Sequence, residues 1–183
     1  MLNTNNKNII VHSCCAPCST YPIEKLIFEG YNPTIFFYNP NIYPVSEYQR
    51  RKNELVSFSN LKKYRLIIQE DSYNWWLKQV KGLEKEPEKG KRCEICFQTR
   101  LEKAAIYAKE NNFEAFTTTL TISPHKNSTV INKIGKEMQE KYKIAFLEEN
   151  FKKNNGFKQS LNISKEYNLY RQSYCGCGFS IMP

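Results

Sequence analysis

The seven cysteines of this chain fall into three tight groups, and this grouping is the feature that most constrains its fold. The groups are Cys14-Cys15-x-x-Cys18, Cys93-x-x-Cys96 and Cys175-x-Cys177. Structural thiols usually occur singly in apolar runs, where they behave as small hydrophobic side chains. Thiols clustered at three separate points are instead typical of a metal or cluster site, because several soft ligands must converge on one small volume. The sequence therefore predicts a fold that brings distant segments together.

The sequence also indicates the compartment in which these thiols work. Residues 1–8 are polar, and the apolar run at 9–11 is too short for the hydrophobic segment of a signal peptide. No stretch approaches the roughly 20 apolar residues of a membrane span, so we expect a cytoplasmic protein without a membrane partner. Thiols stay reduced in the cytoplasm, where clustered cysteines bind metal or carry out redox chemistry more often than they form disulfides. The odd number of cysteines also argues against a fully paired disulfide framework.

The chain is strongly basic, with a formal net charge of +9 over 183 residues. Three groups of lysine and arginine lie at 50–52, 62–65 and 89–92. Such runs are often no more than solvated faces. The alternative is a polyanionic partner, and RNA is favoured over a membrane because the sequence contains no amphipathic basic helix.

Short apolar, β-branched runs alternate with segments of helical periodicity along the chain. We expect strands at 7–13, 33–38, 65–69, 115–120 and 144–147. Helices are expected after a cap at Ser19 or Thr20, from a capping box at Ser46 to about residue 60, after Cys93, over 130–138 and, more weakly, after Gly156. The alternation predicts a single α/β domain over 1–183, with a mostly parallel sheet covered by helices on both faces.

The predicted strand ends gather the polar motifs at one edge of this sheet. Ligands of parallel sheets bind beyond the carboxyl ends of the strands. The first cysteine group and the segments 39–41, 123–126 and 150–153 each follow a predicted strand. We expect the second cysteine pair to join them, together with a cysteine-bearing tail, 168–183, that folds back to the site. Gly176 would let the backbone pass close to a bulky cofactor.

The motifs exclude several familiar sites. The chain contains neither G-x-G-x-x-G nor G-x-x-x-x-G-K-[ST], the usual dinucleotide and phosphate motifs. The C-x-x-x-C-x-x-C pattern of radical-SAM enzymes is incomplete, because Tyr21 occupies its third position. The pairs Cys15/Cys18 and Cys93/Cys96 leave open a structural zinc site in an RNA-binding module without catalysis. Seven thiols exceed the four that a [4Fe–4S] cluster needs, which suggests a cluster plus a second metal or a redox pair.

Four strings carry a resemblance to a known family: HSCCAPCS at 12–19, RCEIC at 92–96, TTTLTISPHKN at 117–127 and YRQSYCGC at 170–177. In this order they resemble epoxyqueuosine reductases of the QueH type, from about residue 8 to residue 180. The resemblance implies the adenine-nucleotide α-hydrolase (HUP) fold, a [4Fe–4S] cluster and a nearby single iron. It also implies the last step of queuosine synthesis, in which the epoxide of epoxyqueuosine is reduced at the wobble position of tRNA. The electron donor is then expected to be ferredoxin- or flavodoxin-like.

The candidate site residues follow from the motifs and the resemblance. All seven cysteines are expected to be metal ligands, although some family members carry an acidic residue at the position of Cys18. Substrate contacts are expected from residues that flank the cysteine motifs or lie at strand ends, namely Arg92, Lys126, Arg171, Asn39, Asn41 and Glu47. His12 is expected to be a hydrogen-bonded core residue. The proton donor is unassigned among Tyr174, Glu88 and a metal-bound water.

Overall fold

The computed structural model describes residues 7–181 and places a sheet of five parallel strands at the centre of an α/β fold. In chain order the strands are β1 (Lys7–Ser13), β2 (Tyr31–Phe37), β3 (Arg65–Ile68), β4 (Ala115–Thr118) and β5 (Ala145–Phe146). Across the sheet their order is β3-β2-β1-β4-β5, and each neighbouring pair is parallel. The strand order changes direction between β1 and β4, and ligands bind at such a point beyond the carboxyl ends.

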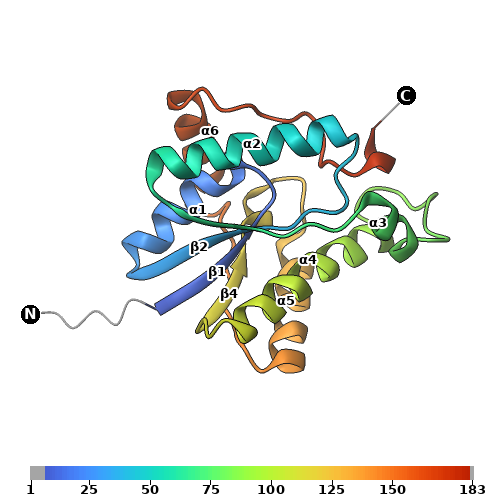
Figure 1. Ribbon diagram of the computed structural model, residues 1–183, viewed down its shortest axis with the longest axis horizontal. Helices are drawn as coiled ribbons and strands as arrows, with labels where there is room; N and C mark the ends of the chain where they lie inside the picture. Colours follow the sequence, from blue (N-terminus) through green and yellow to red (C-terminus); the bar gives the residue numbers. More distant parts are fainter. Residues whose placement is uncertain (1–6, 182–183) are drawn as a thin grey trace, which may run out of the picture.

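Helices cover both faces of the sheet, as Figure 1 shows. One face carries α1 (Ala16–Phe28), α2 (Val45–Lys62) and α6 (Gly156–Glu166), and the other carries α4 (Lys91–Glu110) and α5 (Ser128–Tyr142). The short helix α3 (Tyr73–Gln79) and the 3₁₀ turns η1 (Thr119–Ile122) and η2 (Gly178–Ser180) complete the elements described. This arrangement confirms the predicted fold class. No helix within 7–181 has the length and apolar character to cross a membrane.

The side chains of β1 alternate between the two faces of the sheet, as the period of a strand requires. Ile9 and Val11 pack in the core beneath α1 and α2, whereas Ile10 packs with α4 and α5. All three are completely buried. A strand segment covered on both faces is apolar on both, which is why residues 9–11 form a continuous hydrophobic run.

The start of α1 differs from the prediction, and the difference affects the cysteines. The helix begins at Ala16 rather than after a cap at Ser19 or Thr20. The hydroxyl groups of those two residues instead donate to backbone carbonyl groups one turn earlier in the helix. Cys18 therefore lies within the first turn of α1 and not in the preceding loop.

Three further predictions of local structure were incomplete or wrong. The capping box at Ser46 does not form, because α2 begins one residue earlier with Pro44 at its N-cap. Helix α3 was not predicted; it is capped by Ser72 and buries Trp76 completely. The strand expected to reach residue 120 ends at Thr118, whose hydroxyl oxygen accepts the Leu120 amide and starts η1.

Candidate metal centre and substrate cavity

The first cysteine group forms where β1 ends and α1 begins. Cys14 and Cys15 follow the strand, Cys15 occupies the N-cap of α1, and Cys18 lies in the first turn. Their three sulfur atoms lie within 4.8 Å of one another, and those of Cys14 and Cys15 are 3.7 Å apart. Three soft donors at this spacing suit a single thiophilic ion.

The three thiols of this group differ in acidity. The pKa of the Cys14 thiol lies well below its ordinary value, because Cys15 and Cys18 donate hydrogen bonds to its sulfur and because Lys126 and Arg100 are cationic neighbours. The hydrogen bond to Cys14 in turn raises the pKa of Cys15 to about 12. The free amide groups at the start of α1 also favour a thiolate here. Cys14 therefore loses its proton more readily than Cys15 and Cys18, whose pKa values are raised, and a metal must displace protons from those two.

The other four cysteines line a separate cavity of about 130 Å³. Cys93 and Cys96 come from the start of α4, and Cys175 and Cys177 come from the C-terminal tail. Within 7–181 only the first group places three possible ligand atoms within 4.8 Å, so these four thiols are spread more widely. Four thiols around a cavity of this size match the ligand set of a [4Fe–4S] cluster and leave the room that a cluster needs.

The four thiols face a common cavity, where burial and their mutual proximity affect their acidity. Burial raises the pKa of Cys96 to about 12, and it raises the pKa of Cys93 and Cys177 as well. Cys175 adds to the increase in all three. Cys93, Cys96 and Cys177 are therefore protonated at neutral pH in the metal-free protein, and metal binding must release their protons.

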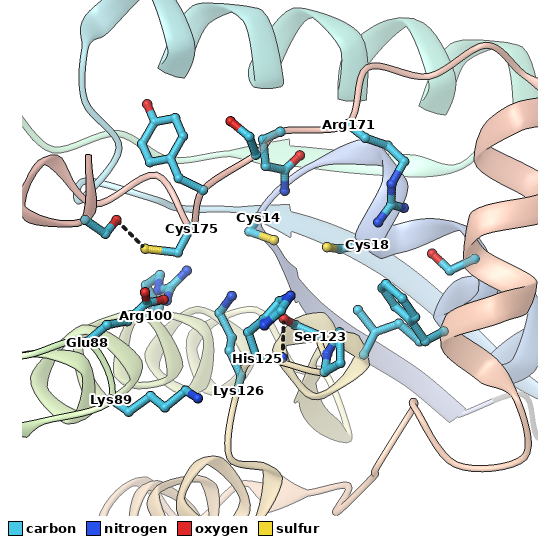
Figure 2. Close-up of a pocket in the computed structure, with 18 of the residues that line it drawn as sticks. Cys14, Cys18, Glu88, Lys89, Arg100, Ser123, His125, Lys126, Arg171 and Cys175 are labelled. Carbon is cyan, nitrogen blue, oxygen red and sulfur yellow. Dashed lines mark hydrogen bonds between the residues drawn. The ribbon is translucent and has the colours of Figure 1, made fainter. Parts of the chain in front are cut away.

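A larger cavity of about 620 Å³ adjoins both thiol groups (Figure 2). Cys14, Cys18 and Cys175 lie in a row across it, with His125 and Lys126 facing them. Its volume falls within the range of roughly 300–1,000 Å³ that is typical of small-molecule sites. The remaining basic residues of its lining are Lys89, Arg100 and Arg171. The cavity therefore combines soft metal donors with a cationic wall.

Arg100 borders both cavities, although nothing in the sequence reasoning singled it out. Its buried guanidinium donates from Nε to the Cys96 carbonyl at 3.1 Å and from Nη1 to Asn39 Oδ1 at 3.4 Å. Asn39 donates in turn to the Ser13 carbonyl, directly before the first cysteine group. The available signal was a positive charge one helical turn after the Cys93/Cys96 pair.

The candidate substrate residues occupy different environments. Lys126 borders both cavities, and Arg171 borders the larger one. Arg92 borders the four-thiol cavity, but its Nη1 donates to the carbonyl groups of residues 83, 84 and 86 and so holds the preceding loop. Asn41 is buried beside the same cavity, and its amide oxygen has no partner among the described residues. Glu47 is buried, with both carboxylate oxygens bonded inside the protein.

Two further expectations concern interior residues. His12 is confirmed as a hydrogen-bonded core residue, since its ring nitrogens lie 3.0 Å from Thr118 Oγ1 and 3.1 Å from the Tyr38 carbonyl. The basic group at 50–52 is not a uniformly exposed cationic surface. Arg51 is completely buried and pairs with Glu47 at 2.6 Å, so it belongs neither to a solvated face nor to a surface that could bind a polyanion.

The fold and the site define a HUP-like α/β protein with clustered thiols at its strand-end crevice. Solved structures support the fold. One is a predicted subunit of a tRNA methyltransferase from Methanocaldococcus jannaschii, with 13% identity, a TM-score of 0.60 and coverage of 93% of this chain and 94% of that one. Another is the U34-tRNA thiolase NcsA from Methanococcus maripaludis with its [4Fe-4S] cluster, with 12% identity, a TM-score of 0.56 and coverage of 98% and 63%. At these identities the likeness concerns the fold alone.

Comparison of sequences identifies the family. The family model described as "Epoxyqueuosine reductase QueH" matches residues 9–182. Relatives with that name are 45% identical in Streptococcus pyogenes, over 94% of this chain and 70% of the relative, and 43% identical in Acinetobacter baylyi, over 98% and 83%. The relative from Thermotoga maritima is 37% identical over 95% and 90%. The chain belongs to the QueH family of epoxyqueuosine reductases and is therefore an oxidoreductase, which excludes the module without catalysis.

Proposed function

We propose that this chain reduces the epoxide of epoxyqueuosine at the wobble position of tRNA and so completes queuosine synthesis in the cytoplasm. The observation that carries the proposal is the gathering of six thiols around two adjoining cavities, with the seventh, Cys15, grouped with Cys14 and Cys18, in a member of the QueH family. We treat 1–183 as one α/β domain whose tail, 168–183, completes the site. Electrons would come from a ferredoxin- or flavodoxin-like donor.

The two thiol groups suggest a division of the metals. Cys93, Cys96, Cys175 and Cys177 would hold a [4Fe–4S] cluster, and the first group, at 14–18, would hold a single iron. When bound, these groups would supply single electrons and a Lewis acid for the epoxide oxygen. The four thiols are spread around a cavity, which fits a cluster, whereas the three thiols of the first group lie close together, which fits a single ion.

The cationic wall of the larger cavity would position the substrate. Lys126 and Arg171 project from different segments of the chain, so together they could grip the phosphates on either side of a nucleotide. An anticodon base can enter such a cavity only after it leaves its stack, and the enzyme must supply contacts that offset the cost. Arg92 and Asn41 lie deeper, beside the four-thiol cavity, where they would act on the base or on the charge of the cluster.

The reaction also requires protons, because reduction of an epoxide to an alkene and water consumes two electrons and two protons. Glu88 and Tyr174 both line the larger cavity and are the candidate donors in this chain. Burial raises the pKa of Tyr174, so its hydroxyl group keeps its proton at neutral pH. That hydroxyl donates to the Tyr43 carbonyl, which holds the phenol ring at the edge of the cavity.

Metal and sulfide analysis of protein purified without oxygen tests this proposal. We expect about five irons and about four acid-labile sulfides per chain, and reduction of epoxyqueuosine in tRNA detected by mass spectrometry of the released nucleosides. Cys96→Ala should lower iron and sulfide together, whereas Cys14→Ala should remove about one iron and leave sulfide unchanged. Both changes should abolish turnover. Zinc as the sole metal after reconstitution with iron and sulfide would contradict the proposal.

A further inference from the structure

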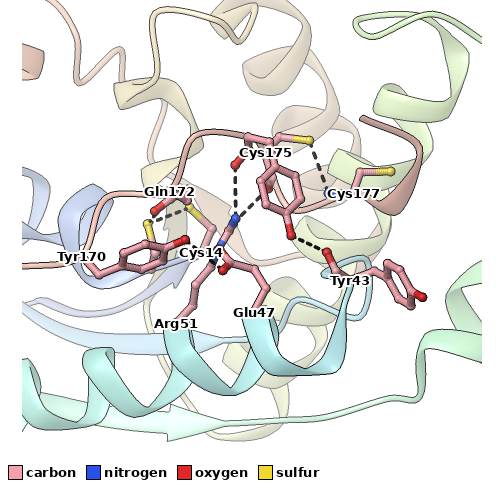
Figure 3. Close-up of polar contacts among 10 residues, drawn as sticks. Cys14, Tyr43, Glu47, Arg51, Tyr170, Gln172, Cys175 and Cys177 are labelled. Carbon is pink, nitrogen blue, oxygen red and sulfur yellow. Dashed lines mark hydrogen bonds and ion pairs between the residues drawn. The ribbon is translucent and has the colours of Figure 1, made fainter. Parts of the chain in front are cut away.

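A buried arginine of α2 grips the backbone of the C-terminal tail (Figure 3). We propose that Arg51 is a positioning residue, which holds Cys175 and Cys177 in place for the four-thiol site before any metal binds. The identity of the metal rests on the proposed function, but the placement of the two thiols does not. Glu47, which the sequence suggested for substrate, then belongs to this support.

Each of the three nitrogen atoms of the Arg51 guanidinium donates a hydrogen bond. Its Nη1 and Nη2 donate to the carbonyl groups of Cys175 and Tyr174, each at 3.1 Å, and its Nε donates to Glu47 Oε1 at 2.6 Å. The other oxygen of Glu47 accepts a hydrogen bond at 3.0 Å from the hydroxyl group of Tyr170, earlier in the tail. The ion pair is therefore attached to the tail at two points separated by several residues.

The glycine between the two tail cysteines fits this contact closely. Gly176 has a φ of +102°, and a Cβ atom added to it would lie 2.8 Å from Arg51 Nη1 and 2.9 Å from Ile42 Cγ1. Its carbonyl group accepts the Tyr43 amide at 2.8 Å, and Ile42 forms an antiparallel bridge with Cys177. A glycine at this position makes room for the arginine beneath the tail.

The energetics favour a specific role for arginine at this position. A completely buried cation is tolerated only when it is paired and hydrogen-bonded, and here Glu47 and the two carbonyl groups meet that need. Lysine would keep the charge but could not offer a planar fork to two successive carbonyl groups. Leu55, one turn further along α2, is buried in the core against the sheet, so the contact connects the tail to a rigid element.

The test measures thiol accessibility in the metal-free protein, so it does not depend on which metal is bound. Alkylation by N-ethylmaleimide, followed by peptide mass spectrometry, gives a rate for each cysteine. In Arg51→Lys the rates at Cys175 and Cys177 should rise on the order of tenfold or more, because the two guanidinium hydrogen bonds to the carbonyl groups of Tyr174 and Cys175 no longer hold the tail. The matched control is Arg65→Lys, an exposed arginine at the start of β3, which should leave both rates unchanged.

Reconstitution with iron and sulfide provides a second readout. Arg51→Lys should incorporate less sulfide than the wild type while its far-ultraviolet circular dichroism is retained. If Arg51→Lys does not fold, Gly176→Ala is measured instead, since its added methyl group should push the same contact apart and raise the same rates. Wild-type alkylation rates in the folded variant would overturn the inference, even if iron analysis supports the cluster. Raised rates in a protein that binds only zinc would support the inference and contradict the proposed function.

Discussion

The salt dependence of tRNA binding gives a quantitative test of the cationic wall. Lys89, Lys126 and Arg171 line the larger cavity from three separate segments, whereas the guanidinium of Arg100 is buried and bonded internally. If each of the three neutralises one phosphate of an anticodon loop, together they contribute about −2.1 to the slope of the logarithm of the association constant against log[salt], at about −0.7 each. Over a fourfold rise in salt concentration, this slope corresponds to about a twentyfold loss of affinity for the RNA.

The perturbation is the triple substitution of these three residues by glutamine. Fluorescence anisotropy with a labelled anticodon stem-loop, measured without oxygen between roughly 50 and 200 mM salt, gives both slopes. The wild type should lose about twentyfold more affinity across this range than the triple variant does. The rate at saturating tRNA should change little, because phosphate contacts are the same in the ground state and the transition state.

The matched control removes the same charge from the opposite edge of the sheet. Lys63 and Lys143 lie two residues before β3 and β5, Lys109 lies in the last turn of α4, and all three are exposed. Their replacement by glutamine should leave the slope close to that of the wild type. Equal slopes for the wild type and the cavity variant would refute the assignment of the wall to phosphate binding. Equal losses in both variants would mean that net charge alone attracts the RNA.

Two further predictions concern the stability of the metal-free protein, measured by urea unfolding. Gly135→Ala should lower the free energy of unfolding by about 1–3 kcal/mol, because the added methyl group would collide with the Phe146 ring; unchanged stability would mean that this ring can move aside. Burial raises the pKa of Glu54, so its charged form destabilises the folded state above that pKa. Glu54→Gln, which can still accept the Tyr170 amide, should therefore be more stable than the wild type at pH 7, and the gain should shrink as the pH falls toward about 4; a gain independent of pH would exclude this cause.

Much of the fold was determined by local patterns in the sequence. The apolar run at 7–13 forms the predicted strand, and the helices of the predicted alternation are all present, because the period of buried side chains is a property of neighbouring residues. The gathering of motifs at strand ends followed from the same alternation, since parallel strands share one carboxyl edge. Errors occurred at the ends of elements, where single hydrogen bonds such as that of Thr118 decide the boundary.

The division of the cysteines was decided only by the tertiary structure. By spacing alone, Cys15 and Cys18 pair as readily with Cys93 and Cys96 as with any other thiols. In the fold the first pair joins Cys14, and the second pair faces the tail. The spacing of ligands within a segment is local, but the choice of partner depends on which segments the sheet and its helices bring together.

The sequence likewise gave no indication of which side chains hold the metal-binding tail in place. Arg50 and Arg51 are adjacent arginines in one polar helix, yet the first is exposed and the second is completely buried. No local pattern separates them, because the partner carbonyl groups lie more than a hundred residues away, at 174 and 175. The sequence by itself determined most of the elements, though not α3, and which ligands are available. Only the packing of the tail on α2 decided which charges are buried to hold those ligands, because burial is set by contacts between segments that are distant in the chain.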